Sequence, residues 1–136
     1  MSVLMSGKLL NSTSVELAHG PSGFKIQTSA PLDNGGDGSR FSPTDLCAAS
    51  LGACATTIMG MFAERIGVSA KIEFEIEKIM GQSPRKIAQL NLTYNIYSNC
   101  ELEQFTKIEN AGRTCPVRLS FGDGIVVNEN YVFKKL

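Results

Sequence analysis

The chain has 136 residues, a length that predicts one domain over residues 1–136. Its 13 basic and 13 acidic side chains cancel and no basic run occurs, so a nucleic-acid partner is not expected. The first ten residues hold no long apolar stretch of a signal peptide, and we expect a cytoplasmic protein.

The first forty residues predict a β-hairpin and a loop. Residues 14–19 and 24–29 read as strands, and Gly20-Pro21-Ser22-Gly23 reads as the longer turn between them. Residues 31–40 are rich in Asp, Asn and Gly, which is typical of a mobile loop.

A long helix is predicted over residues 43–66. Ser42 is a good N-cap, Pro43 suits the first helical position, and Asp45 stands three residues after the cap. Gly67 would end the helix.

Residues 46–63 of this helix carry no charge and reach about the minimum length of a membrane span. Small and hydroxyl-bearing residues dilute the stretch, which favours a buried core helix over a membrane partner. Low charge at its centre indicates burial on most sides, with a second subunit as one possible cover.

The rest of the chain predicts two strands, a helix, a helical turn and a strand. Residues 69–80 alternate apolar and charged side chains, and residues 87–97 alternate with a slip near Gln89. Asn99 is the expected cap of a helix over 101–112, and Pro116 opens a short helical turn before a final strand within 124–136. The expected inward residues of the second strand are Ile87, Leu90, Leu92, Tyr94 and Ile96. The fold class is α+β, an antiparallel sheet packed on a long central helix and a shorter one.

Four cysteines, Cys47, Cys54, Cys100 and Cys115, carry the chemistry open to this chain. None forms a C-x-x-C pair and the only histidine is His19, so neither a metal nor another cofactor is expected. In a cytoplasmic protein these cysteines serve as thiols rather than as permanent disulfides. We interpret Cys47 as a core residue and Cys100 as a surface or packing residue.

Cys54 and Cys115 differ in their expected surroundings. Cys54 lies mid-helix, where burial raises a thiol pKa, so one interpretation is a small apolar residue in a tight helix contact. Cys115 stands where a helical turn starts, and the N–H groups there favour a thiolate, although a loop cysteine with chance neighbours is the alternative. The simplest interpretation of Arg113 and Arg118 beside it, and of Arg40 and Arg65, is solvated charge.

The block SPTDLCAASLGACATTIMGMFAERIGV, followed far downstream by Cys115-Pro116-Val117, resembles the OsmC-like and organic-hydroperoxide-resistance family. The order of elements is similar over nearly the whole chain. The resemblance implies an intertwined homodimer with its central helices buried and two active sites at the subunit interface. It also implies that Cys54 attacks the peroxide and that Cys115 resolves the product.

The implied reaction is thiol chemistry on a small-molecule hydroperoxide. Cys54 becomes a sulfenic acid, Cys115 condenses with it to a disulfide, and a dithiol reductant, in this family often a lipoylated protein, restores both thiols. Met59, Met61 and Phe62 are candidates to line an apolar pocket, although core packing is their commoner role.

One position departs from the family pattern. Its better-characterised peroxidases use an arginine from the N-terminal strands and a glutamate ten residues before the first cysteine, where this chain has Thr44. Asp45 is the neighbouring acid, and Arg40 is a weak substitute for the arginine; Lys8 and Lys25 are the other N-terminal cations. Two hypotheses therefore compete: a thiol peroxidase, and a non-catalytic dimer that binds an apolar or thioester-like ligand at its interface.

Overall fold

Three strands and a short helical turn precede the long helix in this computed structural model, which describes all of residues 1–136. The chain forms two compact units, residues 1–47 and 48–136, and each is described by itself. The domain count expected from the length stays a prediction.

The first unit is a three-stranded antiparallel sheet in the order β1-β2-β3. The strands are β1 (Met5–Asn11), β2 (Ser14–His19) and β3 (Lys25–Ser29), and the 3-10 turn η1 (Leu32–Asn34) follows. The hairpin of β2 and β3 is confirmed. Strand β1 was not predicted, because its residues do not alternate; all seven are exposed, so no buried face imposes a period of two.

Helix α1 (Pro43–Arg65) begins as the sequence predicts. The Asp45 N–H donates to Ser42 Oγ at 3.1 Å, and the Ser42 N–H donates to Asp45 Oδ2 at 2.9 Å. These two bonds form a reciprocal capping pair that satisfies N–H groups at the helix start. At the other end Gly67 has a φ of 72°, a left-handed conformation that suits glycine and stops the helix.

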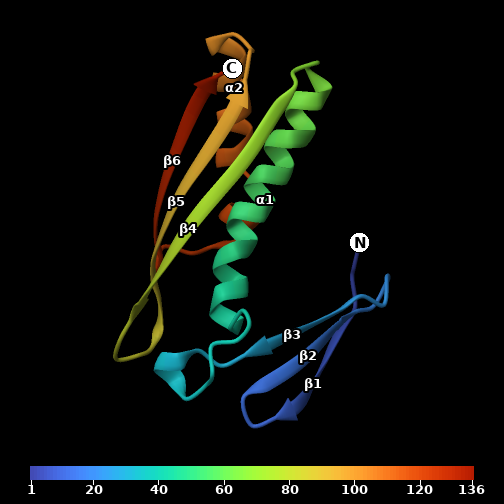
Figure 1. Ribbon diagram of the computed structural model, residues 1–136, viewed down its shortest axis with the longest axis vertical. Helices are drawn as coiled ribbons and strands as arrows, with labels where there is room; N and C mark the ends of the chain where they lie inside the picture. Colours follow the sequence, from blue (N-terminus) through green and yellow to red (C-terminus); the bar gives the residue numbers. More distant parts are fainter. The chain divides into compact units, whose positions relative to one another are not determined.

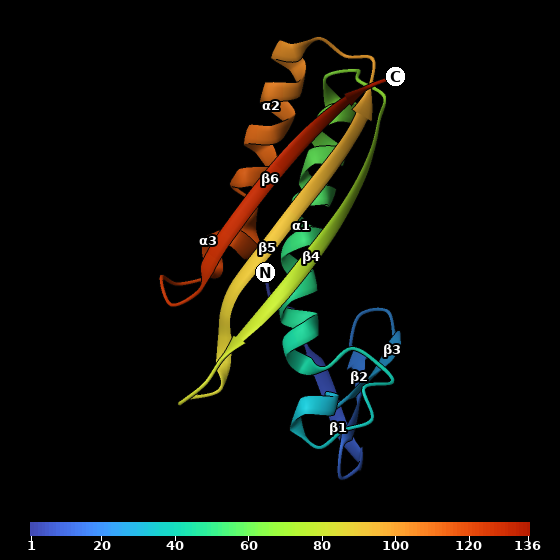
Figure 2. The ribbon, with the colours of Figure 1, turned by 60° about the vertical axis from the view of Figure 1, so that its left-hand side comes forward.

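The second unit packs one sheet against helices, as Figures 1 and 2 show. Its strands are β4 (Ala70–Gly81), β5 (Lys86–Ser98) and β6 (Val126–Lys135), in the order β4-β5-β6. The α+β class is confirmed, and the sheet is mixed. β4 and β5 are antiparallel, whereas β6 is parallel to β5 because α2 (Leu102–Arg113) and α3 (Pro116–Ser120) form the crossover that parallel strands need.

The core lies between one face of this sheet and the helices (Figure 2). The inward residues expected for β5 are all buried, and the predicted slip is an irregularity where Ile79 pairs with Gln89 but Met80 pairs with Ile87. On α1 the buried stripe is Ala48, Leu51, Gly52, Ala55, Met59 and Ala63. Cys47, expected in the core, is exposed, because it lies beside this stripe rather than on it.

Helix α2 begins later than predicted. Glu101, not Asn99, is its N-cap, and Glu101 and Gln104 form a reciprocal capping box in which the Glu101 N–H donates to Gln104 Oε1 at 3.0 Å. A glutamate at this position is an unusual cap, which is why the pattern favoured asparagine.

Helix α1 is long and apolar enough to cross a membrane by length and composition alone, with 33% of its most apolar stretch buried. That is weak support for a span, because a core helix of a soluble protein passes the same test.

Candidate thiol site

Cys54 and Cys115 lie next to each other within the second unit. Cys54 projects from the middle of α1 and is partly exposed, and Cys115 lies at the junction of α2 and α3 with 0% of its surface exposed. The side chains of Cys115 and Cys54 are hydrogen-bonded to each other. No cysteine of the chain is in a disulfide. The fold therefore brings together two thiols that stand 61 residues apart (115 − 54).

A close approach of α2 to α1 makes this meeting possible. At Gly112, three residues before Cys115, an added Cβ would lie 2.9 Å from Met59 Sδ and 3.3 Å from the Tyr131 ring. The absence of a side chain at Gly112 thus lets the end of α2 pack closely against Met59 and Tyr131. Met59 is fully buried here and packs in the core, while Met61 is exposed.

Cys115 occupies the N-cap position of α3, with Pro116 at the first helical position. The sequence predicts that N–H groups at this helix start favour a thiolate; the Arg118 N–H does act to lower the pKa of the Cys115 thiol, but burial outweighs it. Burial raises the pKa of the Cys115 thiol, and the hydrogen bond to Cys54 and the negative charges of Cys54 and Glu129 add to the effect. The Arg118 N–H that faces the sulfur opposes them only in part, because it makes no cap bond of good geometry. Cys115 therefore keeps its proton.

A buried carboxylate stands beside the thiols. Glu129 on β6 is 8% exposed, accepts a hydrogen bond from Arg118 Nε at 3.1 Å and lies 4.0 Å from Arg113 Nη1. Its other oxygen accepts a 2.8 Å hydrogen bond from the Tyr131 hydroxyl. Arg113 also pairs with Glu109 at 3.6 Å. Arg113 and Arg118 are thus paired side chains; Arg113 is exposed, as expected of a solvated charge, whereas Arg118 is only partly exposed.

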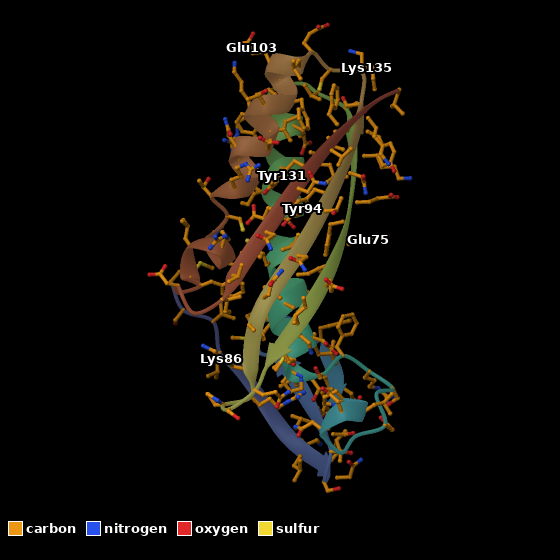
Figure 3. All side chains as sticks on the ribbon, turned by 90° about the vertical axis from the view of Figure 1, so that its left-hand side faces the viewer. Glu75, Lys86, Tyr94, Glu103, Tyr131 and Lys135 are labelled. Carbon is orange, nitrogen blue, oxygen red and sulfur yellow. The ribbon has the colours of Figure 1, made fainter.

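Two tyrosines join this cluster to the sulfurs. Tyr94 and Tyr131 are paired residues of the parallel strands β5 and β6, and their rings stack at 4.6 Å (Figure 3). The Arg113 guanidinium lies over the Tyr131 ring at 4.5 Å. Burial raises the pKa of Tyr94, and the charges of Glu129, Cys115 and Cys54 raise it further. Tyr94 is therefore close enough to both sulfurs to respond to their charge.

Sequence reasoning did not identify Glu129 and Tyr131 as members of the site. A signal for them existed: the alternation of β6 puts Glu129 on the same face as Tyr131 and Phe133, and an acidic residue on an inward face needs a partner. No group of three or more His, Cys, Asp or Glu side chains is arranged to hold a metal ion.

Arg40 and Asp45, the other predicted site residues, belong to the first unit. The Arg40 side chain is exposed, and its backbone N–H donates to Ser29 Oγ at 2.9 Å. Asp45 caps α1. Any role of these two residues at Cys54 stays a prediction.

The family model described as OsmC-like protein matches residues 36–130, which hold both cysteines and every residue of the cluster around them except Tyr131. The chain belongs to the OsmC-like family. Among functionally curated proteins no match is found for this OsmC-like chain.

Solved structures reproduce its fold. A Psychrobacter arcticus protein, named for osmotic stress and detoxification responses, is 27% identical, with a TM-score of 0.86 over 96% of this chain and 94% of that one. An OsmC-like protein of Mycoplasma pneumoniae is 16% identical, with a TM-score of 0.81 over 98% and 97% of the two chains. OhrB of Bacillus subtilis, an organic hydroperoxide resistance protein, is 16% identical, with a TM-score of 0.64 over 96% and 98%.

Proposed function

We propose that this OsmC-like protein has a redox role in stress defence, as a thiol-dependent peroxidase that reduces organic hydroperoxides. The observation that carries the proposal is the contact between Cys54 and Cys115 with unequal exposure. Peroxide must reach the first thiol, whereas the second needs only to meet the first. The names of structural neighbours, which include organic hydroperoxide resistance proteins, support the same direction.

The unequal exposure of the pair assigns the two roles. Cys115 is fully buried and burial raises its pKa, whereas Cys54 is partly exposed and open to peroxide, so Cys54 is the sulfur that attacks. The Cys54 thiolate attacks the terminal peroxide oxygen; the S–O bond forms as the O–O bond breaks, and the alkoxide leaves with the electron pair and takes a proton from water. Sulfur is oxidised to a sulfenic acid while the peroxide is reduced to an alcohol.

The second step joins Cys54 and Cys115 in a disulfide. The Cys115 sulfur attacks the Cys54 sulfenic sulfur, an S–S bond forms, and the hydroxyl leaves with the Cys115 proton as water. A small dithiol or a lipoylated protein then reduces the disulfide by thiol exchange, and both thiols return.

The test is peroxide consumption by the purified protein with tert-butyl hydroperoxide and dihydrolipoamide. Wild type should turn over, and Cys54→Ser should not, because the attacking atom is gone. In the absence of reductant, Cys115→Ser should consume one equivalent as Cys54 becomes a sulfenic acid and a second, more slowly, as that is oxidised to sulfinic acid, and then stop. Cys47→Ser, at an exposed position of the same helix, is the matched control and should keep full activity. A Cys54→Ser protein as fast as wild type would refute the peroxidase proposal.

A second candidate function, binding of an apolar ligand, is favoured by one observation in the first unit. A pocket there is lined almost wholly by apolar atoms; its residues are Met5, Leu17, Ala18, His19, Phe24 and Ile26. This candidate predicts that ligand binding survives Cys54→Ser, and it becomes the better reading if wild type consumes no peroxide.

A further inference from the structure

The Tyr94 hydroxyl is a buried donor with no hydrogen-bond partner. The residue is 0% exposed, and its oxygen is one of only two buried side-chain polar atoms of the chain that lack one, the other being Thr56 Oγ1. Leaving such a group unpaired destabilises a fold, so an unpaired hydroxyl in a site needs a reason.

The surrounding contacts hold this hydroxyl in place rather than pair it. Tyr131 stacks on the Tyr94 ring, and Phe74 of β4 lies at 6.2 Å on a tilted plane. Tyr131 is itself fixed by its bond to Glu129 and by Arg113 over its ring. The ring of Tyr94 is thus clamped while its oxygen stays available near the two sulfurs.

The attacking sulfur needs stabilisation that the charged groups of this cluster do not give. Arg118 is paired with Glu129, and Arg113 lies between Glu109 and Glu129. A thiolate in a half-buried position needs a cation or hydrogen-bond donors close to it. The Tyr94 hydroxyl is an unpaired phenol donor that feels the charge of both sulfurs, and its ring lies near Phe74, which packs against α1 at Gly52, two residues before Cys54.

We propose that the Tyr94 hydroxyl donates a hydrogen bond to the Cys54 sulfur when that sulfur carries negative charge. The inference rests on the peroxidase function proposed above, since it names the group that supports the attacking thiolate. Tyr94 keeps its proton because its pKa is raised, so it acts as a donor and not as a base. The bond forms as the thiol ionises and persists until the S–O bond has formed.

A hydrogen bond to the charged form of a thiol stabilises that form, so removing the Tyr94 hydroxyl should disfavour the Cys54 thiolate. The ionisable and charged groups around the two sulfurs, from every element packed there, are Cys115 between α2 and α3, Tyr94 on β5, Glu129 and Tyr131 on β6, Arg113 on α2 and Arg118 on α3. β4 contributes Phe74, which does not titrate.

The experiment measures alkylation of Cys54 by iodoacetamide against pH, read from the Cys54 peptide by mass spectrometry, in the full chain. Tyr94→Phe keeps the ring and removes the oxygen. It should slow alkylation near neutral pH roughly tenfold and move the midpoint up by about one pH unit. Its melting temperature should stay level or rise, because an unpaired buried hydroxyl is lost.

Thr56→Val is the matched control. It also removes a buried unpaired hydroxyl at constant shape, but Thr56 is two residues from Cys54 on α1 and points to another side of the helix. Its alkylation profile should match wild type.

The proposal is overturned if Tyr94→Phe alkylates like wild type, or if it melts well below wild type, since the hydroxyl would then have a structural partner. The proposal is equally overturned if Thr56→Val slows the alkylation of Cys54 as much as Tyr94→Phe does. Failure of the peroxidase function is separate: wild type would consume no peroxide, while the slower alkylation of Tyr94→Phe would still support the hydrogen bond.

Discussion

At Cys115 two effects of opposite sign act on one sulfur, and burial decides the outcome. The helix start supplies one N–H at the sulfur, a contribution that weakens when the geometry of the cap is poor. Burial removes the water that would solvate a thiolate, and this opposes ionisation more strongly. A short helix start in a dry core is therefore a poor place for the sulfur that meets the peroxide and a suitable one for a sulfur that needs only to meet its partner cysteine.

The same physics makes the fold sensitive to alkali. Burial raises the pKa values of Cys115, Tyr94 and Tyr131, and negative neighbours raise them further. The unfolded chain releases these protons at ordinary values of about 8.5 for Cys and about 10 for Tyr, while the folded chain retains them. The folded state then binds more protons, so the free energy of unfolding falls as pH rises.

We expect this stability to be fully present below about pH 8.5, to decline by about 1 kcal/mol per pH unit near pH 9, where the cysteine contributes, and to decline more steeply towards roughly pH 10.5, where the two tyrosines contribute as well. Urea unfolding across this range checks it. The double variant Cys115→Ser, Tyr131→Phe should show a shallower decline. A flat wild-type profile would contradict the expectation.

The resemblance to the family, rather than the local sequence alone, singles out Cys54 and Cys115. The sequence places Arg113 and Arg118 beside Cys115. What pairs these arginines could not be predicted, because Glu129 reaches them only through the parallel pairing of β6 with β5. That pairing is a long-range property that no window of local sequence contains.

At the scale of elements, the packing of α1 on β4 depends on the absence of one side chain. A Cβ at Gly52 would overlap the ring of Phe74. Gly52→Ala should therefore destabilise the protein by about 1–3 kcal/mol, although alanine is the better helix former. Denaturant unfolding measures the change.

Gly122→Ala is the control for this substitution. Gly122 follows α3, has no atom within 4 Å of its added Cβ, and is not among the glycines with positive φ. The change should stay within about 0.5 kcal/mol. Equal losses for the two variants would show that the contact with Phe74 does not limit the packing.

Elements with a strong periodic face were predicted well. The alternation of β5 gave its buried residues and its irregularity near Gln89, and the cap of α1 followed from Ser42 and Asp45. β1 has no buried face to reveal it, and the direction of β6 depends on the crossover. Local sequence therefore does not predict features that depend on pairing with distant parts of the chain, such as β1 and the direction of β6.

For the whole molecule, the uncovered face of α1 bears on the homodimer implied by the family. Ala53, Thr57, Gly60 and Met61 are exposed on this face, and none is charged. Small residues at helical spacing let another backbone approach closely. We expect a dimer at micromolar concentration by light scattering, built on this face, and Thr57→Arg should shift it towards monomer.

Thr106→Arg on α2 is the matched control. Thr106 is exposed and donates to the carbonyl of Leu102 at 3.0 Å, as Thr57 donates to that of Ala53 at 2.8 Å. It should leave the dimer intact. A wild-type chain that runs as a monomer would rule the dimer out.

Because β6 is the last strand of the chain and pairs with β5 over a long range, the site is completed only at the end of synthesis. Gln89 lies opposite Val126, 37 residues later (126 − 89), whereas β4 and β5 form a local hairpin. Chains emerge from the ribosome N-terminus first, and long-range strand pairings form slowly. Cys54 is therefore made well before Cys115 and Glu129. A nascent chain that stalls between them carries a thiol open to oxidation without the sulfur that would rescue it.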